Sequence, residues 1–193
     1  MKLIVALLFA SGVAFAGTAS AAPVTYDIDP SHTYPSFEAD HMGGLSTWRG
    51  KFNQSSGVIV LDRAARTGTI DVTVQIDSID FGHDEMNRHA VAADIFDAAR
   101  YPTATFKGRF TEFDGDRPEQ AVGEFTLRGV TRTLTLDIDD FKCIQHPMEK
   151  REACGADVST SFNRGDYGLS FGLDMGFKPK VELEIQVEAL RRP

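Results

Sequence analysis

The chain has 193 residues, of which 20 are Lys or Arg, 28 are Asp or Glu, and 42% are hydrophobic. This length suits one domain with a sizeable core. The formal charge is −8 and no cluster of basic residues stands out, which argues against a nucleic-acid partner.

The first 21 residues have the pattern of an export signal. Lys2 supplies a positive start, residues 3–10 form an apolar run, and Ala19-Ser20-Ala21 forms a small-residue cleavage site. The apolar run is too short to span a bilayer comfortably, so we expect no stable membrane insertion. We predict a signal peptide over residues 1–21, one domain over residues 22–193 and a periplasmic location.

Two cysteines, Cys143 and Cys154, bracket a polar segment. In an oxidising compartment such a pair most simply forms one disulfide. The spacing is not C-x-x-C, and two lone thiols make a poor zinc site. We therefore predict a structural disulfide that closes this loop.

Alternation of apolar and polar residues recurs along the chain, as in residues 70–76, 130–138 and 181–189. Such alternation is typical of antiparallel strands with one wet and one buried face. Many short strands at this spacing predict a β-sandwich or an up-and-down barrel. Less regular strands are expected within residues 37–41, 48–52, 104–110, 123–127, 158–162 and 169–173, and turns at residues 42–44, 62–68, 114–116 and 128–129.

Residues 83–99 break this period. Met86, Ala90, Ala93 and Phe96 follow helical spacing, and the segment ends before Tyr101-Pro102. We predict one helix of about four turns here, because the residue before a proline avoids the α region.

Of the 14 phenylalanines, 12 lie after residue 21, and most of these occupy alternating strand faces. Rows of flat apolar rings on inward faces suggest the walls of a space that holds a greasy ligand. Gly50, Gly108, Gly123 and Gly172 lie on or beside these faces and indicate either barrel bends or room for the ligand. The predicted wall residues are Phe37, Trp48, Phe52, Phe81, Met86, Phe96, Phe106, Phe125, Phe162 and Phe171.

Enzyme signatures are weak. His83 and His89 are six residues apart, which is wrong for a zinc helix of the H-E-x-x-H type. We expect no metal site and no catalytic residue. His41 and Arg164 are either hydrogen-bonded core residues or the polar end of an apolar cavity that meets a lipid head group, and Arg88 is a further candidate for the head-group contact.

Several segments together resemble the YceI-like family of exported polyisoprenoid-binding proteins. They include Tyr26-Asp27-Ile28-Asp29-Pro30-Ser31-His32, the run from His41 to Ser46, and Asp94-Ile95-Phe96-Asp97 followed by Tyr101-Pro102. The run from Gly123 to Thr131 and Phe162-Asn163-Arg164-Gly165-Asp166-Tyr167-Gly168 complete the pattern.

The resemblance spans nearly the whole segment after residue 21. It implies an all-β, antiparallel, lipocalin-like barrel of about eight strands with one helix packed against it. It further implies a non-catalytic protein that carries or sequesters a polyprenyl phosphate or an isoprenoid quinone in an apolar tunnel, with no cofactor other than this lipid.

Two other functions stay open at this stage. One is a structural or stress-response module whose barrel is packed shut. The other is an enzyme that acts on a small substrate through His41 or His83. Monomer and homodimer both stay open as assemblies.

Overall fold

The computed structural model describes residues 22–193, so the predicted signal peptide lies outside the described residues. Eleven strands and one short α-helix make up this part of the chain. The strands are β1 (Val24–Ile28), β2 (Tyr34–His41), β3 (Ser46–Phe52), β4 (Ser55–Asp62), β5 (Thr67–Gln75), β6 (Ile79–Asp80), β7 (Thr103–Asp114), β8 (Arg117–Leu127), β9 (Val130–Gln145), β10 (Glu152–Asn163) and β11 (Lys180–Arg191). The helix is α1 (Asp84–Ala90), and two 3₁₀ turns cover Ile76–Ser78 and Arg164–Tyr167.

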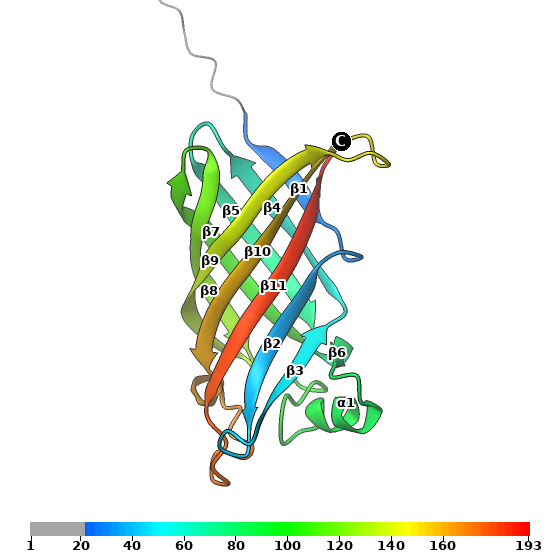
Figure 1. Ribbon diagram of the computed structural model, residues 1–193, viewed down its shortest axis with the longest axis vertical. Helices are drawn as coiled ribbons and strands as arrows, with labels where there is room; N and C mark the ends of the chain where they lie inside the picture. Colours follow the sequence, from blue (N-terminus) through cyan, green and yellow to red (C-terminus); the bar gives the residue numbers. More distant parts are fainter. Residues whose placement is uncertain (1–21) are drawn as a thin grey trace, which may run out of the picture.

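The strands close into an antiparallel barrel (Figure 1). Neighbours run in the order β1-β4-β5-β7-β8-β9-β10-β11, and pairing of β1 with β11 closes the ring of eight. Strand β2 pairs with the first half of β11, and β3 and β6 extend the sheet beyond it. The predicted fold, a lipocalin-like barrel of about eight strands with one helix, is confirmed.

Alternation sets which side chains point inward. In β11, Val181 and Ala189 are buried, while Glu182 and Glu188 between them face solvent. Because successive strand residues point to opposite faces, the apolar half of each alternating run lines the barrel interior. The predicted turns at residues 42–44, 62–68, 114–116 and 128–129 each join consecutive strands, and the turn residues themselves are 42–45, 63–66, 115–116 and 128–129.

The predicted helix over residues 83–99 is too long. Only Asp84–Ala90 is α-helical, with His83 as its N-cap accepting from the Met86 amide. After the helix, the Ala92 amide bonds to the His89 carbonyl and the Phe96 amide bonds back to the Ala90 carbonyl. The next turns place the adjacent residues Ile95 and Phe96 both against the barrel interior.

The predicted strand over residues 169–173 is also wrong. A 3₁₀ turn at Arg164–Tyr167 is followed by successive turns up to Gly176. Gly172 and Gly176 have φ values of 77° and 90°, a region that glycine tolerates and that a strand does not use. Residues 168–179 therefore form a folded loop at one end of the barrel, called the 168–179 loop below.

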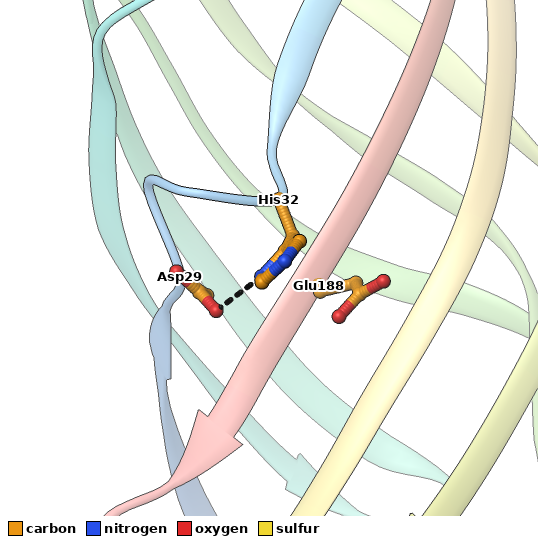
Figure 2. A group of neighbouring side chains, drawn as sticks. All are labelled: Asp29, His32 and Glu188. Carbon is orange, nitrogen blue, oxygen red and sulfur yellow. Dashed lines mark hydrogen bonds and ion pairs between the residues drawn. The ribbon is translucent and has the colours of Figure 1, made fainter.

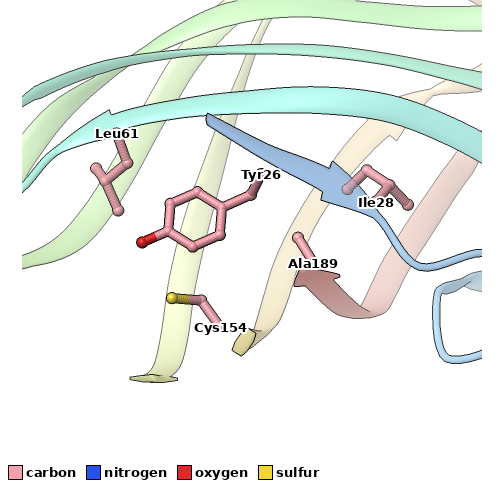
Figure 3. Close-up of a cluster of buried hydrophobic side chains, with 5 residues drawn as sticks. All are labelled: Tyr26, Ile28, Leu61, Cys154 and Ala189. Atoms are coloured by element: carbon pink, nitrogen blue, oxygen red, sulfur yellow. The ribbon is translucent and has the colours of Figure 1, made fainter. Parts of the chain in front are cut away.

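A tightly packed cluster closes the opposite end. Tyr26, Leu61 and Ala189 are each no more than 3% exposed, and Ile28 and Cys154 pack with them (Figure 3). The Tyr26 hydroxyl donates to the Glu152 carboxylate, and burial raises the pKa of this phenol. Both ends of the described chain lie at this closed end (Figure 1).

The predicted disulfide is confirmed at the same end. Cys143 and Cys154 face each other across β9 and β10 and are bonded. The pair therefore locks the hairpin whose connecting loop covers residues 146–151.

As for membrane spans, none of the helices in residues 22–193 combines the length and apolar character needed to cross a bilayer.

Candidate functional site

The barrel encloses an apolar cavity of about 430 Å³. It extends from Ile28 and Val187, next to the closed end, to Phe171 and His89 beside α1. Phe171 is 36% exposed and also lines the cavity, so the cavity reaches the surface at the end that carries α1. We call this end the mouth.

All ten predicted wall residues line this cavity. Their rings contact one another in edge-on pairs: Phe37 lies 5.4 Å from Phe81, and Phe125 lies 5.5 Å from Phe162. Trp48 also meets Phe81 at 5.8 Å, which extends this aromatic wall to the mouth. Edge-to-face pairs of this kind hold rings in fixed orientations, so the aromatic part of the wall is shaped in advance.

Aliphatic side chains form the rest of the wall. The sequence-based prediction did not include them, because it considered mainly aromatic residues. They come from the inward faces of β4, β5, β9, β10 and β11, and the alternation of these strands was the signal that pointed to them. The main members are Ile59, Ile70, Val72, Val74, Leu134, Leu136, Val158, Val181, Leu183, Ile185 and Val187.

Not every phenylalanine borders the cavity. Phe110, Phe113 and Phe141 pack against the Tyr26 cluster at the closed end. Phe177, from the 168–179 loop, does line the cavity, although it was not among the predicted wall residues. Strand alternation places a ring inside the barrel, but it does not tell at which height along the barrel axis the ring lies.

Charged and imidazole groups gather at the mouth. Asp40, His41, His89 and Arg164 all line the cavity there. The His41 ring packs against Trp48 at 4.9 Å and against Phe177 at 5.2 Å. The His89 ring meets Phe171 edge-on at 5.2 Å. Both histidines thus sit among rings at the outer end of the cavity.

Arg164 is half-buried and holds the 168–179 loop. Its Nη1 donates to the carbonyl oxygens of Leu169 and Phe171, both at 2.8 Å. Burial lowers the pKa of this guanidinium, and the nearby Asp40 carboxylate opposes that shift. An arginine stays charged at any relevant pH, so Arg164 brings a fixed positive charge to the mouth.

Asp40 connects the two loops of the mouth. Its Oδ2 accepts from the amides of Gly43 and Lys178, each at 2.9 Å. The amide of Lys178 is the main cause of the lowered pKa of Asp40, and that of Gly43 adds to it. An ionised Asp40 therefore fixes the β2–β3 turn against the 168–179 loop.

Two other predicted polar groups lie elsewhere. Arg88 is exposed on α1 and does not line the cavity. Met86 and His89 do line it, because residues three positions apart lie on the same face of a helix. His83 caps α1 at the surface and does not line the cavity either. Of the histidines considered for acid–base work, His41 alone reaches the cavity, and its ring neighbours are aromatic.

A separate polar group lies outside the cavity, at the turn between β1 and β2 (Figure 2). Asp29, His32 and Glu188 bring possible ligand atoms within 4.8 Å of one another. The Asp29 carboxylate accepts from the Ser31 amide and pairs with His32 Nδ1 at 2.8 Å. Hydrogen bonding to Asp29 raises the pKa of His32. Both Asp29 oxygens are thus hydrogen-bonded within the turn. The group therefore stabilises the β1–β2 turn, and we call it the turn lock.

Comparison with known proteins places this barrel in a family. The YceI-like domain family matches residues 26–189, which is most of the chain. The chain belongs to the YceI-like family. A YceI-like relative, Protein YceI of Escherichia coli, is 34% identical over 192 residues, covering 99% of this chain and 98% of the relative.

Solved structures show the same YceI-like fold. BcnA of Burkholderia cenocepacia matches with a TM-score of 0.68 at 20% identity, covering 83% of this chain and 98% of that one. A polyisoprenoid binding domain from Saccharophagus degradans, implicated in plant cell wall breakdown, matches with a TM-score of 0.62 at 15% identity, covering 88% and 99%. At these identities the likeness establishes the fold alone.

Proposed function

We propose that this protein binds one long-chain isoprenoid-type lipid, a polyprenyl phosphate or an isoprenoid quinone, in the barrel cavity. The observation that carries the proposal is the cavity itself, which holds about 430 Å³ of space behind an almost wholly apolar wall. Ligand pockets typically measure about 300–1,000 Å³ and are lined mainly by hydrophobic and aromatic side chains. A barrel packed shut would leave no such volume.

The mouth suits the polar end of such a lipid. The chain would occupy the apolar length between Ile28 and Phe96, and its head group would stay beside His41 and the Arg164 guanidinium. Arg164 already donates to two carbonyls through Nη1, so its remaining N–H groups would meet the head group. The polyisoprenoid-binding domain of Saccharophagus degradans, which shares this fold, supports the same ligand class.

The chemistry of the wall supports the proposal of binding without catalysis. The His41 ring has aromatic neighbours, and no hydrogen bond or ion pair joins it to another side chain within residues 22–193. We propose a periplasmic carrier or reservoir for the lipid, exported by residues 1–21 and without a further cofactor. Transport and a role in the stress response belong to this proposal, and the assembly is a monomer or a homodimer.

The direct test is to purify the full chain from its native compartment without detergent, extract it with organic solvent and identify the lipid by mass spectrometry. We expect one isoprenoid compound per barrel. Leu136→Trp should fill the lumen and lower the yield severalfold, because Leu136 lines the cavity. Thr135→Trp is the matched control, since Thr135 lies next to it in β9 and is exposed.

A wild-type protein that yields no stoichiometric lipid, and that takes none up from a total membrane lipid extract, would overturn the proposal. Equal lipid yields from Leu136→Trp and wild type, with both folded by circular dichroism, would show that the lipid sits outside the cavity.

A further inference from the structure

The surface around the mouth is unusually apolar. Within residues 22–193 the large hydrophobic side chains that are exposed are Met42, Leu45, Ile144, Met148, Phe171 and Met175. Four of these six, Met42, Leu45, Phe171 and Met175, belong to the β2–β3 turn and the 168–179 loop. We call these four the apolar rim. Ile144 lies at the end of β9 and Met148 in the loop between β9 and β10, beside the Cys143–Cys154 disulfide. This β9–β10 loop is at the opposite end of the barrel (Figure 1).

The two segments of the rim form one surface. Figure 1 shows the β2–β3 turn beside the start of β11, at the end of the barrel that carries α1. Asp40 accepts from amides of both segments, and a Cβ on Gly43 would lie 3.2 Å from the Gly176 carbonyl oxygen. Arg164 fixes the 168–179 loop through the Leu169 and Phe171 carbonyls. The rim is therefore held in place by hydrogen bonds while its apolar side chains face solvent.

The rim is also continuous with the cavity. Phe171 belongs to both, because it lines the cavity and is 36% exposed at the surface. Phe177 of the same loop lines the cavity and packs on His41. An apolar path thus leads from the lumen through the mouth to the exposed side chains of the rim.

We infer that the apolar rim docks on the surface of a lipid bilayer, so that a lipid enters or leaves the cavity without its chain crossing water. The inference rests on the proposed lipid-binding function. Exposed apolar patches on soluble domains mark membrane or protein contacts. The continuity of this patch with an apolar cavity selects the bilayer, because a bilayer is both the partner and the source of the cargo.

The charge of the rim specifies the kind of bilayer surface. Residues 42–45 and 168–179 together contain one carboxylate, Asp174, and one ammonium, Lys178. Without a net positive charge there is little attraction to anionic lipid, so docking depends on the apolar side chains. Phosphatidylcholine vesicles should therefore suffice, and added phosphatidylglycerol or salt should change binding little.

The test is flotation of the full chain with phosphatidylcholine vesicles. Leu45→Ser should lower the vesicle partition constant about tenfold, because it removes one apolar side chain from the lipid contact. Met175→Ser should weaken binding in the same direction. Met148→Ser is the matched control: its side chain is 80% exposed, against 75% for Leu45 and 58% for Met175, but it lies at the other end and should leave binding unchanged.

Trp48, the one tryptophan, supplies an independent readout because it lines the cavity at the mouth. Vesicles of brominated phosphatidylcholine should quench its fluorescence, and removing the vesicles should reverse the part of the quenching that is due to docking. Quenching that persists reports lipid held in the cavity. Leu45→Ser should weaken the reversible part of the quenching. Met148→Ser should show the same quenching as the wild type.

Absence of vesicle binding by the wild type would overturn the inference, and so would equal losses in Leu45→Ser and Met148→Ser. Rim variants that alter oligomeric state on a sizing column but not vesicle binding would also overturn it, since the rim would then join two copies of the chain. A stoichiometric lipid in the extract without vesicle docking refutes the docking alone. Rim-dependent docking of a protein that never contains lipid refutes the proposed function alone.

Discussion

The disulfide should contribute about 3 kcal/mol to the stability of the barrel without affecting the cavity. Cys143 and Cys154 are 11 residues apart, and in the chain-entropy model a loop of this size restricts the unfolded chain by about 3 kcal/mol. For a domain of this size, each kcal/mol shifts Tm by roughly 2–4 °C. The reduced protein should therefore melt about 6–12 °C below the oxidised one.

Thermal unfolding followed by circular dichroism measures this difference on protein that is reduced in denaturant and refolded with reductant. Reduction leaves both sulfurs in place, so it isolates the effect of the crosslink. Replacing both cysteines by Ala should lower Tm further, because Cys154 is 8% exposed and packs in the Tyr26 cluster. Lipid content should stay the same, since the disulfide lies at the closed end. A reduced protein that melts within about 2 °C of the oxidised one would refute the entropic reasoning.

Three further changes test other parts of the structure. Gly50→Ala should destabilise the barrel by about 1–3 kcal/mol in urea unfolding, because its Cβ would lie 2.6 Å from Phe37 Cζ, whereas Gly155→Ala, with nothing nearer than 3.5 Å, should be tolerated. Asp29→Asn should bring the raised pKa of His32 back toward about 6.5 in an NMR titration. In the wild type, the stabilisation due to His32 is complete below that pH and is lost as the pH rises through the raised value; an unchanged titration would count against the turn lock. Arg164→Lys should increase hydrogen exchange at Leu173 and Phe177 but not in β5, because one ammonium replaces a guanidinium that holds two loop carbonyls.

Sequence patterning predicts the barrel well because a strand has only two faces. Once Phe106 and Phe125 are placed on strands with regular alternation, their inward direction follows, and the structure pairs them directly across β7 and β8. The disulfide was predictable for a similar reason, since two cysteines offered a single pairing. Those features depend on local periodicity or on simple counting.

The mouth was less predictable because tertiary packing decides it. The segment after α1 has helical spacing, yet it forms successive turns, in which the Phe96 amide bonds to the Ala90 carbonyl and the Asp97 amide to the Ala92 carbonyl. The apolar run at Leu169 and Phe171 resembles a strand, but Gly172 and Gly176 allow it to fold into a loop, and the side chains of Arg164 and Asp40 hydrogen-bond to this loop. Asp40 and its partner Lys178 are 138 residues apart, and a contact between such distant residues leaves no periodic signal.

Glycines facing phenylalanines explain how a barrel lined by so many rings still contains a cavity. A Cβ on Gly50 would clash with the Phe37 ring, and one on Gly108 would lie 2.7 Å from Phe106 Cε1. Each ring therefore covers the bare backbone of a glycine and lies against the wall, instead of projecting into the lumen. A side chain at either position would push the ring inward, where it would take up volume that we assign to the lipid. The glycines therefore leave room for the rings at the wall. Because the rings lie there, the centre of the barrel stays open as the cavity.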